Sequence, residues 1–380
     1  MATSTVPLGR AEPSIHGAST SRARGREINH LASTRPVPNP VLTEAIDTLA
    51  SNRDLSAEQT AHVLAEIMAG NASETQTAAV LVALRTKGET VDELVGLALT
   101  MRRLATPVEV ERDDLLDTAG TGGGRPTFNV STTAALIAAG AGCAVAKHGN
   151  RSATGLSGSA DLLEALGVRI DLDPAAVARC ITEAGFGFMF APAHHGATRW
   201  VIPVRKELAV RTIFNFLGPL TNPAGATRQL IGVSDPRFLD TIAAALARLG
   251  ARRALVVSSH DGLDEMSTSG TTRVVEVGGA ELRSYEISPE DVGLARASVD
   301  EVAGGPPEAN AAVARAIFAG ERGAPRDLAV LNGGAAIYVG GRAESLEAGV
   351  RAAEQAVDSG AAAAALDRLV ALSGELAPPR

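Results

Sequence analysis

The sequence predicts an α/β protein with a small N-terminal helical domain and a larger domain in which helices flank a mostly parallel central sheet. The first observation is that apolar residues recur at helical spacing from Pro40 to Arg103. The second is that short apolar runs alternate with helical patterns from Leu115 onward, which indicates βαβ units. These patterns predict a helical domain at 39–110 and an α/β domain at 111–380.

Composition and charge exclude several classes of function. The chain has 380 residues, 45% of them hydrophobic, and this length is enough for one large or two ordinary domains. A net charge of -8 argues against a nucleic-acid partner. No run of about 18 apolar residues occurs, so we expect no membrane span. Cys143 and Cys180 lie in apolar runs, and we expect buried thiols in a reducing compartment, the cytoplasm.

The first 38 residues differ in composition from the rest. They are rich in Ser, Thr, Arg, Pro and Gly, and their only acidic residues are Glu12 and Glu27. Such a start is also typical of organelle transit peptides. Because no clear amphipathic helix pattern occurs, we expect residues 1–38 to form a disordered extension.

The segment from Pro40 to Arg103 carries helix start and stop signals but no site chemistry. Gly70 and Gly88 are expected to end two of its helices. We expect these helices to pack against a second copy, which predicts a homodimer, and to close over a site. Three helix starts carry the capping-box pattern: Ser56 with Gln59, Ser73 with Gln76, and Thr90 with Glu93.

The α/β segment is expected to contain six strands with helices between and after them. The predicted strands are Leu115–Thr118, Ala144–Lys147, Phe186–Phe190, Gln229–Val233, Ala254–Ser258 and Thr272–Val277. The predicted helices include Pro174–Ala184, Pro236–Leu249, Glu308–Arg322, Asp327–Val339, Ala343–Ser359 and Ala362–Leu372.

The loop after the first predicted strand is rich in glycine. Four glycines occur from Gly120 to Gly124, and Ser131 and Thr132 follow at the expected N-cap and first turn of a helix. Such glycines let the backbone approach an anion, which the N–H groups of a helix start also attract. By themselves they fit a phosphate loop and a plain tight turn equally. The spacing matches neither a Walker loop nor a dinucleotide fingerprint.

The second predicted strand ends in another polar loop, which begins at Lys147 and continues through His148, Gly149, Asn150, Arg151 and Ser152. Ligands of open parallel sheets bind outside the carboxyl ends of the strands, so both loops are expected to serve one site. Lys147 and Arg151 supply positive charge, and Asn150 offers a donor and an acceptor. This second loop favours phosphate binding over a plain turn.

Three carboxylates follow a later predicted strand. Asp261, Asp264 and Glu265 fit a turn cluster, because Asp-Gly is a turn signal. They also fit a Mg²⁺ site, because Mg²⁺ takes one or two carboxylates together with substrate phosphates. The second interpretation accounts for the lysine and arginine expected opposite.

Two other features have modest interpretations when taken alone. His194 and His195 follow a predicted strand, and loop hydrogen bonding is the simpler expectation for His194. A role as ligand or acid/base group stays open for His194, whereas His195 is not expected to be catalytic. Arg205 lies in a helical segment and would by itself be a solvated surface residue.

Together these stretches resemble the anthranilate phosphoribosyltransferase family, within the nucleoside-phosphorylase-like phosphoribosyltransferase class. The resemblance runs from about Pro40 to Leu372. The residues that match family motifs are 120–123, 128–132, 147–152, 190–192, 203–205, 211–223 and 264–265, with His195 and Arg199. It implies that a helical segment near 200–222 returns to the N-terminal domain and brings Arg205 over the cleft.

The resemblance implies a reaction and its ligands. The phosphoribosyl group of 5-phosphoribosyl 1-pyrophosphate passes to the amine of anthranilate, giving N-(5-phosphoribosyl)anthranilate and pyrophosphate, the second step of tryptophan biosynthesis from chorismate. Mg²⁺ would be held by Ser131, Asp264 and Glu265. Anthranilate would contact Gly120, Asn150 and Arg205, whose guanidinium would pair with its carboxylate.

The resemblance also implies a set of contacts to phosphoribosyl pyrophosphate. No certain catalytic residue is expected, because the amine of an aromatic acid is neutral at pH 7 and needs no strong base; Lys147 and Asn129 act by position and charge. The implied contacts are Gly120, Thr121, Gly122, Gly123, Gly124, Thr127, Asn129, Val130, Ser131, Thr132, Lys147, His148, Gly149, Asn150, Arg151, Ser152 and Ser159.

One departure from the family pattern leaves alternatives open. Gly124 stands where the family has an aspartate that helps to order the sugar phosphate, and the loop is one residue shorter. A transferase for another aminobenzoate is one alternative, and a weakly active regulatory paralogue is another. A pyrimidine-nucleoside phosphorylase of the same fold is disfavoured, because its loop typically reads Lys-His-Ser-Thr-Gly-Gly.

Overall fold

Four helices begin the described part of the chain. The computed structural model describes residues 37–152 and 155–378, so the extension expected at 1–38 lies almost wholly outside the described residues. Within the described part, no helix is both long enough and apolar enough to cross a membrane. The first helices are α1 (Pro40–Ala50), α2 (Ala57–Met68), α3 (Glu74–Lys87) and α4 (Val91–Leu104).

Two of the three predicted capping boxes form, and the third is only half formed. Ser56 and Thr90 make the reciprocal bonds at the starts of α2 and α4. Ser73 accepts the Gln76 N–H at 3.2 Å, but the Gln76 side chain turns to the backbone of Asn39, 3.0 Å from both its N–H and its carbonyl. Gln76 therefore ties α3 to the start of α1 rather than closing its own cap.

The α/β segment forms one seven-stranded sheet of order β3-β2-β1-β4-β5-β6-β7. The first five strands in that order are parallel, and β6 and β7 pair antiparallel at one edge. The predicted fold class is confirmed. The strands are β1 (Leu115–Asp117), β2 (Ala144–Gly149), β3 (Phe186–Phe190), β4 (Arg228–Gly232), β5 (Arg253–Ser259), β6 (Thr272–Gly278) and β7 (Glu281–Ile287).

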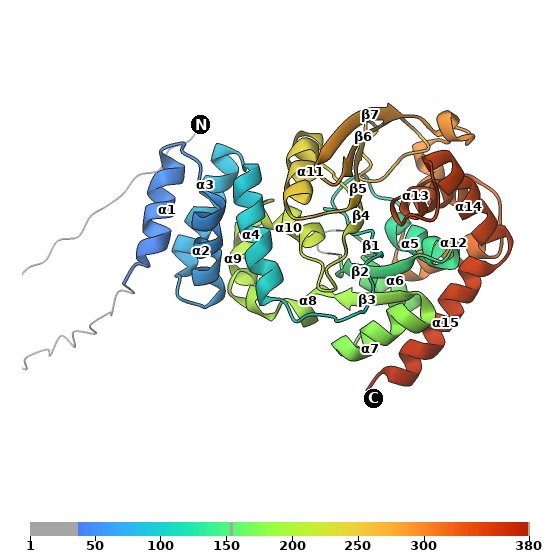
Figure 1. The fold of residues 1–380 in the computed structure, drawn as a ribbon, viewed down its shortest axis with the longest axis horizontal. Coiled ribbons are helices and arrows are strands. Elements are labelled where there is room, and N and C mark those ends of the chain that lie inside the picture. Colours follow the sequence, from blue (N-terminus) through green and yellow to red (C-terminus); the bar gives the residue numbers. More distant parts are fainter. Residues whose placement is uncertain (1–36, 153–154, 379–380) are drawn as a thin grey trace, which may run out of the picture. The chain divides into compact units, whose positions relative to one another are not determined.

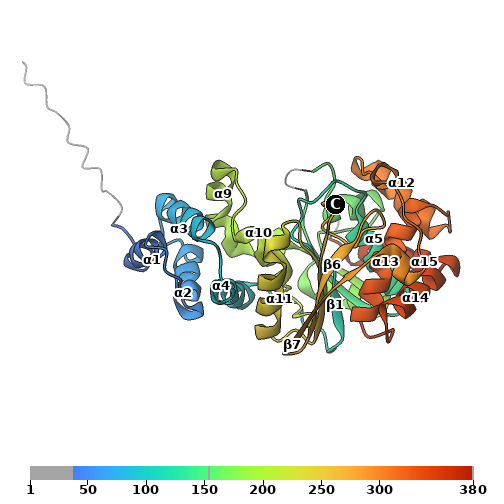
Figure 2. The ribbon, with the colours of Figure 1, turned by 90° about the horizontal axis from the view of Figure 1, so that it is seen from above.

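Helices cover both faces of the sheet (Figures 1 and 2). On one face lie α5, α12, α13, α14 and α15, whose apolar residues share a core with β1, β2 and β3. On the other face lies α11, whose Leu246 packs in a core that runs from Leu64 of α2 to Val256 of β5. The bounds are α5 (Val130–Gly140), α11 (Leu239–Arg248), α12 (Pro307–Phe318), α13 (Ala324–Val339), α14 (Leu346–Asp358) and α15 (Ala361–Leu376).

Shorter helices connect these layers, and two predicted helices begin or end differently from expectation. The helix expected at Pro174–Ala184 ends as one turn of π-helix, and the one expected at Pro236–Leu249 begins as a 3-10 turn. The shorter helices are α6 (Ser159–Ala165), α7 (Pro174–Arg179), α8 (Ala191–His194), α9 (Ile202–Leu208) and α10 (Phe214–Leu220).

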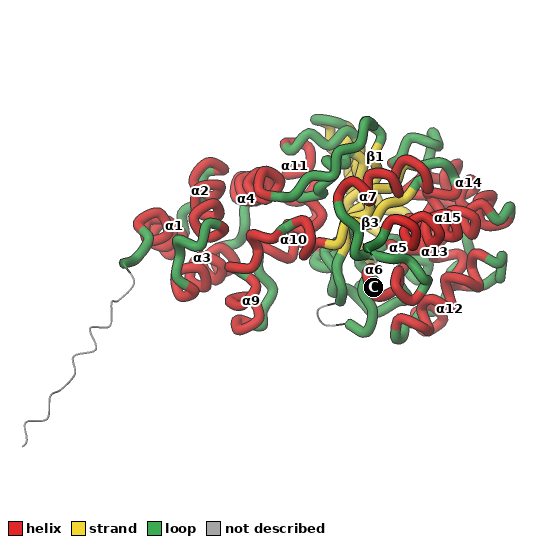
Figure 3. The backbone as a smooth tube through the Cα atoms, turned by 90° about the horizontal axis from the view of Figure 1, so that it is seen from below, coloured by secondary structure: helices red, strands yellow, loops and turns green. Residues whose placement is uncertain are grey.

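The segment carrying α9 and α10 returns to the N-terminal helices. Its buried Val204, Ile213 and Leu217 belong to the core that contains Leu64, and Figure 3 shows α9 and α10 beside α3 and α4. Helix α10 runs through Pro219 and ends at Leu220, with Thr221 as its C-cap. Pro219 has no N–H, so it makes no helical hydrogen bond to the carbonyl four residues earlier.

Candidate active site

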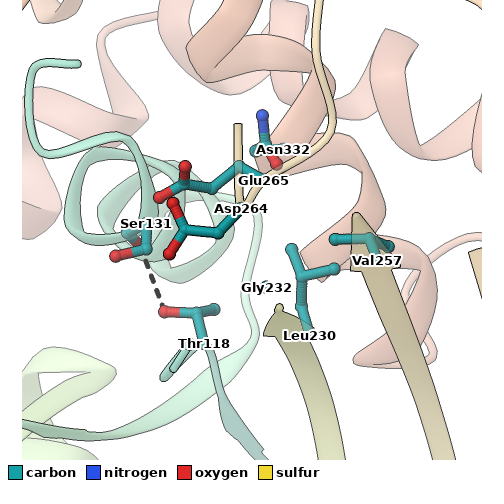
Figure 4. A pocket seen from close by; sticks show the side chains of 9 residues that line it. Thr118, Ser131, Leu230, Gly232, Val257, Asp264, Glu265 and Asn332 are labelled. Atoms are coloured by element: carbon teal, nitrogen blue, oxygen red, sulfur yellow. Dashed lines mark hydrogen bonds between the residues drawn. The ribbon is translucent and has the colours of Figure 1, made fainter. Parts of the chain in front are cut away.

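The carboxyl ends of the parallel strands enclose one pocket (Figure 4). Residues that follow β1 and β5 meet there with residues of β4 and β5 and with the first turn of α5, near the strand ends where ligands of parallel sheets bind. The lining residues are Thr118, Gly120, Ser131, Leu230, Gly232, Val257, Asp264, Glu265 and Asn332. The glycine loop and the predicted acidic pair therefore meet at one pocket, and of the second predicted loop Lys147 lies beside it, bonded to Thr118.

Backbone geometry explains why the glycine loop needs its glycines. Gly122 and Gly123 have φ values of 67° and 83°, a region that side chains rarely adopt. A Cβ on Gly120 would lie 3.0 Å from the Gly232 carbonyl. Thr121 donates its N–H to that same carbonyl at 2.8 Å, which fixes the loop to the end of β4.

Gly124 accounts for the departure from the family pattern. A Cβ at Gly124 would come within 2.4 Å of Asp264 Oδ1 and 2.7 Å of the Asp264 nitrogen. The loop therefore lies directly on Asp264, with no room for a side chain at Gly124. The nearby Gly122 backbone N–H acts to lower the pKa of the Asp264 carboxyl, against the desolvation that raises it. The shortened loop packs on the carboxylate with its backbone.

Asn129, rather than Ser131 or Thr132, is the N-cap of α5, and its side chain does not cap the helix. Its amide instead donates to the Ser157 carbonyl at 3.0 Å, and its Oδ1 accepts from Ser157 Oγ and from Asn310 Nδ2. Asn129 thus joins the helix start to the loop before α6 and to α12. Ser131 and Thr132 lie in the first turn.

Three other residues of this stretch, Thr127, Val130 and Thr132, are also predicted contacts, and all three are at least half-buried. Thr127 is half-buried, and its carbonyl lies so close to Gly304 that a Cβ there would approach it to 2.1 Å. Val130 is fully buried in the core. The buried Thr132 hydroxyl has no hydrogen-bond partner among the described residues.

Lys147 lies under the pocket with 1% of its surface exposed. Its Nζ donates to Thr118 Oγ1 at 2.9 Å and lies 3.5 Å from Ser131 Oγ. Burial lowers its pKa to about 8, although the charges of Asp117 and Glu265 oppose that shift. A buried ammonium beside the pocket is a strong local source of positive charge.

Asp117 is a buried partner that the sequence analysis did not single out. Its carboxylate accepts from the N–H groups of Ala119 and His148 and from Asn222 Nδ2 at 2.8–3.1 Å. Desolvation raises its pKa, while the positive charge of Lys147 and these donors lower it. Asp117 holds the ends of β1 and β2 together beneath the site.

The rest of the Lys147–Ser152 loop is arranged unevenly. His148 is buried, and its Nδ1 lies 3.0 Å from the Gly218 carbonyl. Gly149 leaves no room for a side chain, because a Cβ would lie 2.8 Å from the Phe188 ring. Asn150 is exposed, and its Oδ1 accepts the Arg151 N–H at 2.8 Å.

The Arg151 side chain forms ion pairs with two carboxylates of α6. Its guanidinium pairs with Asp161 and Glu164 and lies 5.7 Å from the centre of the Phe190 ring. The Ser152 N–H also bonds to Asp161, and Ser159 begins α6 beside Gly149. Two carboxylates thus already partner the Arg151 charge.

The predicted metal-binding residues lie together. Figure 4 shows the carboxylates of Asp264 and Glu265 side by side and turned toward Ser131. Desolvation raises the pKa of both carboxyls, and their proximity raises that of Glu265 further. Glu265 Oε2 is buried without a hydrogen-bond partner. A pair of crowded carboxylates with an unpaired oxygen fits a hard divalent cation such as Mg²⁺.

The protein alone supplies few ligands to such a cation. Across residues 37–152 and 155–378, no group of three or more His, Cys, Asp and Glu could hold a metal. If Asp264, Glu265 and the Ser131 hydroxyl held Mg²⁺ as predicted, coordination positions would remain for substrate oxygens or water, as is usual for Mg²⁺ bound with phosphates.

Arg205 projects from α9 as a half-buried cation. Its guanidinium lies 5.5 Å from the centre of the Phe214 ring, and burial lowers its pKa. In the described part of the chain no carboxylate forms an ion pair with it within 4.0 Å. A partly desolvated guanidinium without an anion is suited to take one from a ligand.

The histidines lie in the connection between the helices and the sheet. His194 Nδ1 is 3.0 Å from the Thr106 carbonyl, in agreement with the loop hydrogen bonding expected for it. The His195 and His148 rings lie 5.0 Å apart. Burial lowers the pKa of His195 to about 3, so it is neutral at pH 7.

Two buried asparagines near the site were missed in the sequence analysis. Asn332 of α13 makes two hydrogen bonds to the backbone of Met266. Its Oδ1 accepts the Met266 N–H at 3.0 Å, and its Nδ2 donates to the Met266 carbonyl at 2.8 Å. Asn310 of α12 donates to Asn129. A lone asparagine within the apolar pattern of α13 was a usable signal, whereas nothing near Asn310 sets it apart.

Comparison with known proteins agrees with this geometry. The domain described as "Glycosyl transferase family, a/b domain" matches residues 112–363, and the "Glycosyl transferase family, helical bundle domain" matches residues 43–105. The fold and the site therefore define a glycosyltransferase with a helical domain and an α/β domain.

Individual relatives narrow this class. The anthranilate phosphoribosyltransferase of Rubrobacter xylanophilus is 54% identical over 339 residues, covering 89% of this chain and 99% of the relative. That of Moorella thermoacetica is 50% identical over 332 residues, covering 87% and 98%. The chain belongs to the anthranilate phosphoribosyltransferase family, which confirms the resemblance.

Solved structures agree with that assignment. The crystal structure of the Thermus thermophilus enzyme has a TM-score of 0.83 at 47% identity, covering 87% of this chain and 99% of that one. A Saccharomyces cerevisiae anthranilate phosphoribosyltransferase, solved in complex with PRPP and Mg, has a TM-score of 0.81 at 26% identity, covering 88% and 98%.

Proposed function

We propose that this chain transfers the phosphoribosyl group of 5-phosphoribosyl 1-pyrophosphate to the amine of anthranilate, in the second step of tryptophan biosynthesis from chorismate. One observation carries the proposal: a buried lysine, a glycine loop and a crowded carboxylate pair meet at the same strand ends in a member of this family. The arrangement suits a ligand with several phosphates and a metal ion.

The donor is held between the glycine loop and the carboxylate pair. Asp264, Glu265 and the Ser131 hydroxyl hold Mg²⁺, and the loop from Gly120 to Gly124 offers N–H groups to the phosphates. When bound, Mg²⁺ neutralises charge on the departing pyrophosphate. The support in this chain is the unpaired Glu265 oxygen, and the Saccharomyces cerevisiae relative has been solved with Mg.

Other donor contacts come from the two strand-end loops and the start of α5. Lys147 adds positive charge from below the pocket. The remaining contacts proposed for the donor are Thr127, Asn129, Val130, Thr132, His148, Gly149, Asn150, Arg151, Ser152 and Ser159.

The acceptor is held on the helical side. Arg205 pairs with the carboxylate of anthranilate, Asn150 contacts the ring substituents, and Gly120 leaves space beside the ring. The supporting observation is that Arg205 is half-buried, desolvated and lacks an anion among the described residues. A Saccharomyces cerevisiae relative has been solved with 4-fluoroanthranilate.

The chemical step needs little proton transfer from the protein. The neutral amine supplies the electron pair that forms the bond from nitrogen to the anomeric carbon as the bond from that carbon to pyrophosphate oxygen breaks. The amine then loses a proton to solvent or to the leaving group. The protein contributes by orienting the reactants and by placing Lys147 and the loop N–H groups near the charge that develops on pyrophosphate.

The proposal also assigns parts of the chain and an assembly. Residues 111–380 hold the donor, and the helical domain at 39–110, with the segment at 200–222, brings the acceptor grip. We propose a homodimer through the N-terminal helices, supported by the exposed Val82, Leu99 and Leu104 on α3 and α4. A monomer by light scattering at micromolar concentration would contradict it.

We place the reaction in the cytoplasm, where the buried free thiols Cys143 and Cys180 stay reduced. One assay tests the function directly. The purified protein with Mg²⁺ and phosphoribosyl pyrophosphate is offered a panel of aminobenzoates while anthranilate fluorescence and pyrophosphate release are followed. Preferred consumption of anthranilate with stoichiometric pyrophosphate is expected, and preference for another aminobenzoate would refute the assigned acceptor.

A further inference from the structure

Arg125 joins the two loops that form the donor half of the site. Its backbone N–H donates to the Gly262 carbonyl at 2.7 Å, and its guanidinium donates to Asp261 Oδ2 at 3.0 Å. A third bond runs from the guanidinium to the Val299 carbonyl at 3.2 Å. One residue of the glycine loop is thus fastened to the loop that follows β5 and to the segment after β7.

The partner of Arg125 is the centre of a closed turn. Asp261 Oδ2 also accepts from Ser267 Oγ at 2.7 Å, and Asp261 Oδ1 accepts the Leu263 N–H at 3.2 Å. Asp264 follows three residues after Asp261 in the same turn. A group that holds Asp261 therefore fixes the turn from which the carboxylate pair projects.

The surroundings of this ion pair limit its movement. The Arg125 and Asp261 side chains are 19% and 13% exposed, so water weakens their attraction less than at the surface. Pro126 follows Arg125 and biases its backbone toward an extended conformation. Among the described residues, this is the only ion pair that joins segment 120–127 to segment 260–271.

The glycine loop has few other means of keeping its distance from the carboxylates. Gly124 contacts Asp264 with bare backbone, and no side chain fits between them. Arg211 holds the opposite side of the loop by donating to the Gly123 carbonyl at 2.6 Å, but Arg211 itself is exposed. On the carboxylate side, the Arg125 guanidinium adds the side-chain bonds of the loop to the two backbone bonds that Thr121 and Arg125 make to Gly232 and Gly262.

We propose that Arg125 is a positioning residue that sets the spacing between the phosphate-binding glycine loop and the Asp264–Glu265 pair through Asp261. It does not touch the reacting atoms. Its effect is to place the metal-binding carboxylates and the loop N–H groups on the two sides of one pyrophosphate before the donor binds. This inference rests on the proposed function for the identity of the donor.

The test compares Arg125→Ala and Arg125→Lys with the unmutated protein. Mn²⁺ as a probe for Mg²⁺ is titrated by electron paramagnetic resonance, and phosphoribosyl pyrophosphate with Mg²⁺ by calorimetry, both without acceptor. We expect Arg125→Ala to weaken both affinities about tenfold, the scale of one lost charge-assisted contact. Lysine keeps the charge but lacks the fork, so Arg125→Lys should recover only part of the affinity.

Steady-state kinetics separate positioning from a general loss of structure. KM for phosphoribosyl pyrophosphate and the Mg²⁺ concentration for half activity should rise in Arg125→Ala, whereas KM for anthranilate should stay within about twofold. The matched control is Arg252→Ala, which removes an exposed ion pair with Asp113 away from the pocket and should change none of these.

A double-mutant cycle with Asp261→Asn tests whether Arg125 acts through Asp261. If Arg125 acts through Asp261, the double variant should be no worse than the poorer single variant. Fully additive losses, or Mn²⁺ and donor affinities in folded Arg125→Lys and Asp261→Asn equal to those of the unmutated protein, would overturn the inference. Should Arg125→Ala fail to fold, those two variants decide it.

The same measurements distinguish this failure from failure of the proposed function. If the unmutated protein binds phosphoribosyl pyrophosphate but does not consume anthranilate, the acceptor assignment fails and the Arg125 comparison still stands. If the unmutated protein binds Mn²⁺ but not the donor, the proposed function fails, and the Mn²⁺ titrations alone judge Arg125: an unchanged affinity overturns its role.

Discussion

The donor half and the acceptor half of the site differ in how far their side chains are fixed before any ligand binds. On the donor side, Lys147 is buried and hydrogen-bonded, and the glycine loop is held by Arg125 and Arg211. On the acceptor side, Asn150 is exposed and Arg205 has no anion among the described residues. The proposed pyrophosphate site is thus charged and hydrogen-bonded before a ligand binds, whereas at the proposed acceptor site the counter-charge of Arg205 would come from the ligand.

This difference predicts that substitutions on the donor side reduce turnover more than those on the acceptor side. A preorganised charge acts on the transition state without reorganisation, so its loss lowers kcat. Losing the contact to a carboxylate far from the reacting atoms mainly lowers the affinity for one substrate. The following substitutions test that contrast, beginning with the largest expected effect.

Replacing Asp264 and Glu265 together by alanine should abolish turnover, with a fall on the order of a thousandfold or more. The reason is loss of the metal that neutralises the pyrophosphate. The measurement is pyrophosphate release over a Mg²⁺ series, with circular dichroism to show that the fold survives. Undiminished activity of the double variant at low Mg²⁺ would disprove the metal assignment.

The same variant has a readout apart from activity. Burial raises the pKa of both carboxyls, so the unfolded chain ionises first as pH rises from about 4, and the pair destabilises the metal-free fold at neutral pH. Mg²⁺ should therefore raise Tm more at pH 7.5 than at pH 5. The double variant should lose that Mg²⁺ dependence.

Lys147→Met should lower kcat/KM for phosphoribosyl pyrophosphate by about a hundredfold, because a buried cation is removed while its volume is kept. In the unmutated protein, kcat/KM for the donor should fall as pH rises through about 8, where Lys147 loses its proton. The check is a pH profile from 6.5 to about 9.5, read against the reference pKa of lysine. A profile with the same alkaline limb in Lys147→Met would assign that limb to another group.

Stability should move in the opposite direction over the same range. The folded pKa of Lys147 is lowered to about 8, so between that value and the unfolded value near 10.4 the unfolded chain binds more protons. This group therefore makes the fold more stable as pH rises through that window. Thermal melts of the unmutated protein and Lys147→Met isolate its contribution.

The fold could be predicted from the sequence because most strands are apolar and because most helix caps join residues only three apart in the chain. All six predicted strands are present within one or two residues. Strand β7 was missed because its side chains are mostly exposed and its sequence, Glu281 to Ile287, reads as polar. The half-formed cap at Ser73 failed because Gln76 found a partner 37 residues away.

The candidate site was predicted as a set of loops rather than as a network. Glycines and adjacent acids are visible in the sequence, so the pocket could be anticipated. The side chains that set its geometry have distant partners: Arg125 meets Asp261 across 136 residues, and Asn332 holds Met266 across 66. Periodicity and local motifs carry no record of such pairs, which only the folded chain brings together.

Arg205→Ala should raise KM for anthranilate roughly tenfold to a hundredfold and leave KM for phosphoribosyl pyrophosphate nearly unchanged. Loss of one buried charge-assisted contact costs about 1.5–3 kcal/mol. Initial rates over both substrates give the two constants, and Lys206→Ala, on the exposed side of α9, is the matched control. Equal rises in both constants, or aniline reacting as well as anthranilate with the unmutated protein, would remove Arg205 from the acceptor site.

The smallest expected effect concerns Gly124, a residue of the glycine loop that lies directly against Asp264. In Gly124→Ala, the new Cβ would lie 2.4 Å from Asp264 Oδ1 and 2.7 Å from the Asp264 nitrogen. Overpacking of this kind costs about 1–2 kcal/mol. Because the strain falls on a metal-binding carboxylate, KM for the donor and the Mg²⁺ requirement should rise about fivefold to thirtyfold, and KM for anthranilate should not.

Gly124→Asp sharpens the test. It restores the acid of the family pattern within a loop that is one residue shorter, so the new carboxylate meets Asp264 instead of the sugar phosphate. We expect donor affinity to fall at least as far as in Gly124→Ala, because like charges repel at this distance. Tighter donor binding in Gly124→Asp would mean that the loop relaxes freely around Asp264, and the donor half would then be far less rigid than its hydrogen bonds indicate.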